Sequence, residues 1–342
     1  MNAHRFTHLA AALVVALSAT AAHAVTIDWV TVGDPGNLAH SSTNANQNGY
    51  GAVAESFRIM KYEWTNSQYV DFLNAVDPSG TNPNSIYDNS MGSDARGGIS
   101  FTSGNAAGNK YAVKTNMGDK PVNYVSWFDA ARVANWLQNG QGSGSTETGA
   151  YTLSGSTSGN APAVNPGATF YIPTEDQWYK AAYYKGGSTN AGYWDYATQN
   201  DTAPTVVTSG STGIGSAGGT GNFANYNNGA DWNGQVGNVT TVGTNGGPSA
   251  YYIYDMSGNV FEWNDLTGTA SSSRGIRGGN WGNGALSLSP AGGGTMNPSF
   301  EGGTTGVRLA SPVPVPEPST YCMALAGLAC GGYLVRRRRK RA

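Results

Sequence analysis

Long stretches rich in glycine, asparagine, serine and threonine dominate this sequence and separate a few short segments with regular patterns. The longest of these stretches are residues 79–118, 139–167 and 201–221. Compact domains contain few irregular connections longer than roughly 12 to 15 residues, so the stretches indicate surface loops with a binding role or tolerated insertions. No fixed-period repeat and no linker divides residues 25–310, which favours one large domain.

Three helix starts share one pattern, in which a Ser or Thr cap is followed three residues later by a side chain that can bond the cap's own backbone N–H. The pairs are Thr65 with Gln68, Ser126 with Asp129, and Thr174 with Gln177. Apolar residues at helical spacing follow each start, and we assign them to packing: Tyr69, Phe72, Leu73, Val76; Ala130, Val133, Ala134, Leu137; Trp178, Ala181, Ala182. Short alternating segments predict strands at residues 57–59, 275–277 and 307–309.

The charge of the chain is unevenly distributed. Of 342 residues, 12% are charged and 39% are hydrophobic, a composition too apolar for a disordered protein. Seven of the 19 basic residues lie at the two ends, so residues 25–335 carry 12 basic and 21 acidic groups, a net charge of -9. This acidic body argues against a nucleic-acid partner, which needs clustered Lys and Arg, and favours attraction of cations.

Rare residue types exclude several classes of chemistry. Cys322 and Cys330 both fall in a C-terminal apolar run, so the body has no thiol for a nucleophile or a thiolate metal site. After position 24, His40 is the only histidine, which excludes zinc and non-haem iron sites built on two or three imidazoles. We interpret His40 as a solvated loop residue rather than a member of a serine triad, because its Asn- and Ser-rich surroundings contain no nucleophile motif.

The N-terminal segment has the pattern of a secretory signal. Residues 1–24 contain a basic Arg5, an apolar run over residues 9–17, and the small-x-small sequence Ala22-His23-Ala24 that a signal peptidase recognises. We therefore predict a signal peptide over residues 1–24 and export of the protein.

The C-terminal segment combines three features in order. The sequence Val315-Pro316-Glu317-Pro318-Ser319 precedes an apolar run at residues 321–335 and a basic cluster at residues 336–341. The run is short against the roughly 20 residues of a membrane span, so we expect transient insertion with the cations on the cytoplasmic side. The arrangement resembles the PEP-CTERM sorting signal of Gram-negative bacteria, which implies that residues 311–342 are processed by an exosortase and that the protein ends at the cell surface or outside the cell. A plain membrane anchor is the alternative.

Six segments between the two ends occur in a characteristic order: residues 62–69, 121–130, 172–178, 254–263, 277–281 and 306–310. Together they resemble the formylglycine-generating enzyme, or sulfatase-modifying-factor, domain, over about residues 55–310. The resemblance implies that residues 25–310 form a single irregular α+β domain related to C-type lectins.

A calcium site is expected at residues 255–262, where two carboxylates and an amide surround a glycine, the hard-oxygen composition that calcium favours. The resemblance implies that Asp255 and Glu262 bind one structural calcium together with the backbone carbonyls of Gly258 and Val260. It also implies a second calcium held by Asn225, whose acidic partner the sequence does not identify.

Another interpretation of the two carboxylates needs no metal. Asp255 and Glu262 then only cap turns and pair with Arg277 or Arg308.

The oxidase chemistry of the family depends on two copper-binding cysteines that follow its Arg-Gly-Gly-x-Trp segment. By spacing, Asn283 and Leu288 occupy these positions here. Neither side chain binds Cu(I), for which thiolate is the fitting ligand, so we expect no copper and no oxidation of a substrate cysteine to formylglycine. The related iron-dependent sulfoxide synthases need a histidine cluster that the single His40 cannot provide.

Two hypotheses for function remain. In the first, the protein is a non-catalytic binding module with a carbohydrate or protein ligand. Aromatic rings beside amides favour sugars, and the candidates are Asn280, Trp281, Asn283 and Trp232. Trp281 could equally be a core residue. An exopolysaccharide ligand follows only by analogy with other PEP-CTERM proteins.

In the second hypothesis the protein is an enzyme, either a formylglycine-generating oxidase acting on sulfatases or another activity on the same scaffold. Its candidate residues are the pair Glu175 and Asp176, or Asp255 and Glu262. Glycoside hydrolysis needs two carboxyl groups across one cleft, roughly 5 to 10 Å apart. We expect Glu175 and Asp176, adjacent in a first helical turn, to point apart and to favour the helix dipole instead.

Overall fold

The computed structural model describes residues 24–313. The predicted signal peptide and nearly all of the predicted sorting segment, including the apolar run 321–335, lie outside this range. The helices are α1 Asn66–Val76, α2 Ser90–Ser93, α3 Trp127–Gln138, α4 Glu175–Tyr183 and the 3-10 helix η1 Ala285–Leu288. None of the helices in residues 24–313 has the length and apolar character of a membrane span.

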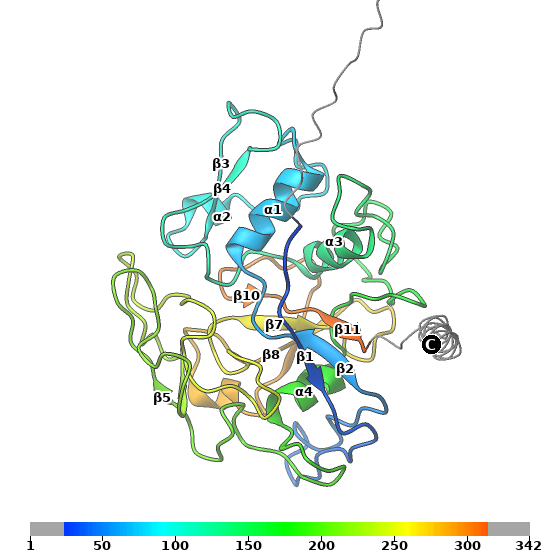
Figure 1. Ribbon diagram of the computed structural model, residues 1–342, viewed down its shortest axis with the longest axis vertical. Coiled ribbons are helices and arrows are strands. Elements are labelled where there is room, and N and C mark those ends of the chain that lie inside the picture. Colours follow the sequence, from blue (N-terminus) through cyan, green and yellow to red (C-terminus); the bar gives the residue numbers. More distant parts are fainter. Residues whose placement is uncertain (1–23, 314–342) are drawn as a thin grey trace, which may run out of the picture.

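The strands are short and form two sheets and two small ribbons. One sheet has the order β1 (Trp29–Val32), β2 (Phe57–Met60), β11 (Ala310–Pro312), and the other has the order β10 (Thr305–Gly306), β7 (Phe261–Asn264), β8 (Arg274–Arg277), β9 (Gly294–Met296). The ribbons pair β3 (Ile99–Phe101) with β4 (Tyr111–Val113) and β5 (Thr205–Val206) with β6 (Phe223–Ala224). Figure 1 shows the sheets in the middle of the molecule, with α1, α2 and α3 above them and α4 below. This is the irregular α+β arrangement that the sequence predicts.

The three predicted helices form at the predicted caps. At Thr65, Ser126 and Thr174 the cap side chain accepts a bond from the third helical N–H, and the third side chain bonds back to the cap's N–H. All predicted apolar faces turn inward, with only Val76 partly exposed. Local hydrogen bonding and packing therefore agree, as the pattern predicts.

Two of the three predicted strands are confirmed and one is wrong. Residues 57–59 lie in β2 and residues 275–277 in β8, but residues 307–309 belong to no strand. They connect β10 in one sheet to β11 in the other, so they do not pair continuously with one neighbouring strand. The backbone carbonyls of Val307 and Leu309 instead accept bonds from the N–H groups of Trp64 and Met60, at 2.9 and 3.0 Å.

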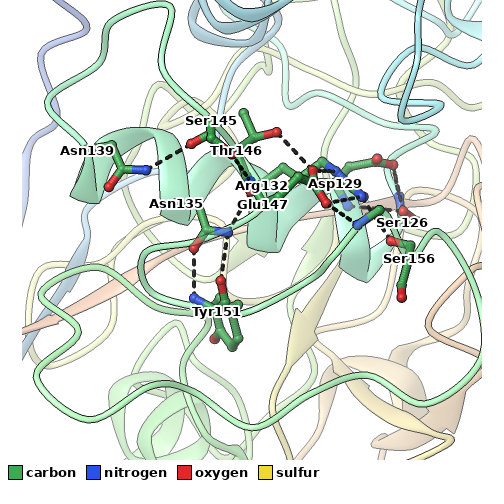
Figure 2. Close-up of polar contacts among 11 residues, drawn as sticks. Ser126, Asp129, Arg132, Asn135, Asn139, Ser145, Thr146, Glu147, Tyr151 and Ser156 are labelled. Atoms are coloured by element: carbon green, nitrogen blue, oxygen red, sulfur yellow. Dashed lines mark hydrogen bonds and ion pairs between the residues drawn. The ribbon is translucent and has the colours of Figure 1, made fainter.

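The long polar stretch 139–167 is fixed to helix α3 by side chains of that helix (Figure 2). Arg132 forms an ion pair with Glu147 at 2.8 Å and donates to the Ser156 carbonyl at 2.9 Å. Asn135 donates to two carbonyls of the loop and accepts from the N–H of Tyr151 at 2.7 Å. Loop and helix are thus held together by polar contacts that satisfy buried groups.

The stretch 79–118 is less irregular than its composition suggests. It contains α2 and the β3–β4 ribbon, which packs Phe101 and Tyr111 against Tyr87 with ring centroids 5.2 to 6.0 Å apart. The sequence analysis predicts a surface loop or insertion here and misses these short elements, which form because aromatic residues spaced within the polar sequence supply a small core.

Candidate functional site

A fully buried ion pair lies at the centre of the molecule, between Glu262 on β7 and Arg308. The Arg308 guanidinium donates to both Glu262 carboxylate oxygens at 2.8 to 3.1 Å. Glu262 Oε2 also accepts from Nε1 of Trp178 on α4 at 2.7 Å. These are the contacts expected if Glu262 pairs with Arg308 instead of binding a metal. They neutralise the charge of Glu262 within the protein.

Asp255 is buried beside this pair, in a turn whose backbone is left-handed (φ 61°). Its carboxylate accepts from the N–H of Gly243 and from Asn245 Nδ2, the latter at 2.9 Å. Burial raises the pKa of Asp255, and the neighbouring Glu262 adds to the effect. Gly258 follows with φ 87°, and a Cβ there would stand 2.2 Å from the Asn225 carbonyl oxygen, so only glycine permits this approach.

Glu63 is a third carboxylate in this region, and the sequence interpretation did not assign it a role. It is fully buried; Oε2 accepts from Asn259 Nδ2 at 2.8 Å, while Oε1 has no hydrogen-bond partner. Burial raises the pKa of Glu63 well above its usual range, and the charges of Asp255 and Glu262 raise it further. The only signal in the sequence was an acid inside the family-like segment at residues 62–69.

This region suits calcium because it contains buried side-chain oxygen atoms that accept no hydrogen bond. Besides Glu63 Oε1, the buried Oδ1 of Asn225 has no partner. A hard cation would satisfy both kinds of oxygen. Within residues 24–313 no three His, Cys, Asp or Glu side chains are grouped to hold a metal, so amide and backbone carbonyl oxygens would have to supply much of the coordination.

The predicted ligand residues Asn280, Trp281 and Asn283 form a compact turn. Asn283 Oδ1 accepts from the Asn280 N–H at 3.1 Å, and Asn280 Oδ1 accepts from the Gly282 N–H at 2.8 Å. Trp281 is partly buried, and the Arg96 guanidinium lies 4.4 Å from the centre of its ring. The side-chain oxygens of both asparagines are bonded within the turn, while its backbone groups also bond to neighbouring segments.

Trp232, the fourth candidate, is buried near Trp281, and the two pack with Val239 and Val260. Lys120 lies 4.9 Å from the centre of the Trp232 ring, whose Nε1 donates to a backbone carbonyl. Both tryptophans thus contribute to packing and carry a cation on one face.

Asn283 and Leu288, the two residues that spacing in the sequence assigns to the family's copper cysteines, contain no sulfur. Asn283 has its carboxamide bonded within the turn, and Leu288 in η1 is fully buried against Ala224 and Tyr226. Residues 24–313 contain no cysteine. The described residues therefore offer no thiolate to Cu(I).

A cavity of about 660 Å³ opens beside the first turn of α4. Its walls come from four separate segments, and its lining comprises Asn46, Gly49, Tyr50, Glu175, Asp176, Leu266, Thr267, Thr269, Ala270, Ser271, Arg277, Ala291, Gly293, Gly294 and Thr295. Ligand sites commonly have volumes of roughly 300 to 1,000 Å³. No pattern in the sequence indicates this cavity as a whole.

Glu175 and Asp176 both line this cavity, contrary to the expectation that adjacent side chains in a first helical turn serve only the helix. Glu175 forms an ion pair with Arg277 of β8, which also donates to the Pro290 carbonyl at 2.7 Å. Asp176 Oδ1 accepts from the Gly51 N–H at 2.8 Å. Burial raises the pKa of both carboxyl groups, and Arg277 opposes the effect.

His40 secures the loop that forms one wall of the cavity. Its Nδ1 lies 2.6 Å from the Tyr179 hydroxyl, and its ring stacks on Tyr193 at 4.8 Å. Backbone bonds of 2.8 Å join it to Gly49 and Tyr50. His40 is thus a partly exposed loop residue, as the sequence indicates, but its ring packs against two tyrosines instead of being freely solvated, and burial lowers its pKa.

The short strands, capped helices and long polar loops define a single-domain fold related to C-type lectins. The model of the sulfatase-modifying factor enzyme 1-like domain matches residues 20–313. The chain thus belongs to the sulfatase-modifying-factor family, and its residues 314–340 match the PEP-CTERM protein-sorting motif. This motif implies processing by an exosortase, export, and membrane-anchored sorting.

Several solved structures are similar to this chain, one of them with a TM-score above 0.5. Treponema denticola variable protein 1 is 20% identical with a TM-score of 0.51, covering 85% of this chain and 97% of that one. CarF is 22% identical with a TM-score of 0.49 and coverage of 84% and 99%. PvdO from Pseudomonas aeruginosa is 18% identical with a TM-score of 0.40 and coverage of 84% and 92%. The chain has no match among curated proteins.

Proposed function

We propose that this exported member of the family is a non-catalytic binding module that acts at the cell surface or in the extracellular matrix. The observation that supports the proposal is the chemistry at Asn283 and Leu288, the residues that spacing assigns to the oxidase cysteine positions: a carboxamide whose oxygen is hydrogen-bonded and a buried aliphatic side chain. The family scaffold persists around them, with its helices capped and its core filled. A scaffold without its redox ligands is best suited to recognition, with carbohydrate or protein as the ligand.

We also propose a structural calcium in the region of Asp255 and Glu262, with the backbone carbonyls of Gly258 and Val260 and, for a second ion, Asn225. Support comes from the donorless oxygens of Asn225 and Glu63. Because Arg308 already balances Glu262, Glu63 and Asp255 are the carboxyl groups left for a cation, which would favour their charged forms against the burial that raises their pKa. Metal analysis of the purified protein, with thermal unfolding in calcium and in EDTA, tests this. Equal stability in both, without bound metal, would contradict it.

An enzyme of another type is the second candidate, and one observation favours it. Glu175 and Asp176 share a cavity, as the two carboxylates of a hydrolase must. The ion pair with Arg277 argues against Glu175 as a proton donor, because it stabilises the charged form. Release of reducing ends from the producing organism's exopolysaccharide, lost in Glu175→Gln and in Asp176→Asn, would establish the enzyme.

The binding proposal is tested by retention of the purified exported protein on the producing organism's exopolysaccharide, in calcium and then in EDTA. Retention supports a matrix or surface role. Incubation with copper, oxygen and a sulfatase-derived cysteine peptide provides the complementary assay, and the thiol is expected to remain unchanged. Conversion of that cysteine to formylglycine would overturn the non-catalytic proposal.

A further inference from the structure

We propose that the cavity beside α4 is the ligand site and that it binds a neutral sugar unit of a polysaccharide through Asp176. This inference rests on the proposed binding function and specifies where recognition occurs. The other candidate surface, around Trp281, has a guanidinium over the indole ring, and the amide oxygens of Asn280 and Asn283 are bonded within the turn. The cavity instead presents carboxylate, hydroxyl and amide side chains around one space.

The charges on the cavity wall select the class of ligand. Arg277 is balanced by Glu175 and held by the Pro290 carbonyl, so its positive charge is not available to an anionic ligand. Asp176 adds a negative charge, since no basic group pairs with it within the described residues. The wall thus carries one net negative charge, which disfavours uronic acids and phosphates and favours donors such as sugar hydroxyls.

Asp176 has one oxygen engaged and one available. Oδ1 accepts from the Gly51 N–H, which fixes the carboxylate, while Oδ2 receives no bond from the described residues. A hydroxyl donating to a carboxylate makes a charge-assisted hydrogen bond, stronger than one between neutral groups. A fixed acceptor of this kind is what orients a sugar hydroxyl.

The rest of the lining suits a polyhydroxylated molecule. Hydroxyl and amide side chains that can donate or accept surround the space: Asn46, Thr267, Thr269, Ser271 and Thr295. Gly293 packs closely against Arg277, and a Cβ there would lie 2.7 Å from the guanidinium, so glycine permits this contact in the cavity wall. Tyr50 contributes an aromatic ring to the wall, and its loop is secured by His40.

The test uses the exported protein on an array of neutral, amino-sugar and uronic-acid oligosaccharides, together with retention on the native exopolysaccharide. Two variants alter the cavity. Asp176→Asn removes the acceptor charge and keeps the bond to Gly51, and Ala270→Trp fills the cavity from an exposed loop position. Asp201→Asn is the matched control, because Asp201 also accepts a backbone N–H but lies off the cavity.

We expect binding to neutral oligosaccharides that weakens at least about tenfold in both cavity variants, equivalent to about 1.4 kcal/mol, and stays unchanged in the control. Retention of both variants at the parent's level would overturn the cavity assignment while leaving the binding function standing. Binding confined to uronic-acid or amino-sugar oligosaccharides would overturn the neutral-sugar assignment. A folded parent that binds only a protein would overturn the sugar site and keep the binding module, and one that binds nothing would overturn both.

Discussion

The Glu262–Arg308 pair and the Glu175–Arg277 pair lie on neighbouring strands, with Glu262 on β7 and Arg277 on β8, yet they face different surroundings. Glu262 and Arg277 stand opposite each other on β7 and β8, and α4 contacts one through Trp178 and the other through Glu175. The first pair is sealed in the core, whereas the second lines a cavity.

The difference shows that similar charged groups acquire different roles through burial. In the core every oxygen of Glu262 meets a donor, and no solvent or ligand can reach it. At the cavity, the neighbouring Asp176 keeps an oxygen open. We therefore assign the core pair to stability and the cavity wall to recognition.

The largest expected effect comes from removing the cation of the core pair. Arg308→Met leaves Glu63, Asp255 and Glu262 without their common counter-charge, and we expect the free energy of unfolding to fall by about 3 to 5 kcal/mol. Urea unfolding measures the loss, which should shrink towards acid pH as the carboxylates take up protons. Arg58→Met, at a partly exposed arginine, is the control. A loss no larger than the control's would contradict the structural assignment.

A smaller loss of stability is expected when the hydrogen bond from α4 to Glu262 is removed. Trp178→Phe removes the N–H that reaches Glu262, and deletion of a donor to a buried charge costs about 1 to 3 kcal/mol. Trp194→Phe is a matched control, because Trp194 Nε1 has no hydrogen-bond partner. Thermal unfolding of the two variants compares them, and equal effects would show that the bond contributes nothing beyond ring packing.

A third group of carboxyl side chains, Glu301 with Asp129 and Asp88, contrasts with both ion pairs in its dependence on pH. Burial raises the pKa of Glu301, and Asp129 and Asp88 add to it. A carboxyl whose pKa is higher in the folded state stabilises the fold below its unfolded value, near about 4.3, and loses that contribution as pH rises through the folded value.

The expected result is that the parent loses stability relative to Glu301→Gln by about 1 kcal/mol between about pH 5 and about pH 9, allowing for partial exposure. Urea unfolding across this range measures the difference between parent and variant, which removes contributions from other groups. A difference that is constant with pH, or that changes in the opposite direction, would contradict the prediction.

The smallest effect on stability is expected at the cavity. Asp176→Asn keeps the acceptor for Gly51 and loses only a favourable charge in the first turn of α4, so the free energy of unfolding should fall by less than about 1 kcal/mol. Denaturant unfolding of Asp176→Asn and of Arg308→Met under the same conditions compares the two losses of stability directly. A loss as large as that of the core variant would place Asp176 among the structural charges.

Local signals in the sequence predicted what local physics decides. The capped helix starts at Thr65, Ser126 and Thr174 are complete in themselves, so the sequence located them correctly. The order of the family-like segments predicted the α+β domain, and the three C-terminal features predicted the sorting motif.

What the sequence could not show depends on contacts between distant segments. The stretch at residues 307–309 changes sheets rather than joining one, and no local pattern reveals this. Glu63 is important only because folding brings it near Asp255. The cavity combines four segments between residues 46 and 295, so no spacing in the sequence could indicate that Asp176 and Arg277 share a wall.

The most direct test of this account is a crystal structure of the exported protein with the neutral oligosaccharide that binds it most tightly. We predict a sugar ring in the cavity beside α4, with a hydroxyl within hydrogen-bond distance of Asp176 Oδ2. A sugar seated over Trp281 and Asn283, with the cavity filled only by solvent, would contradict it.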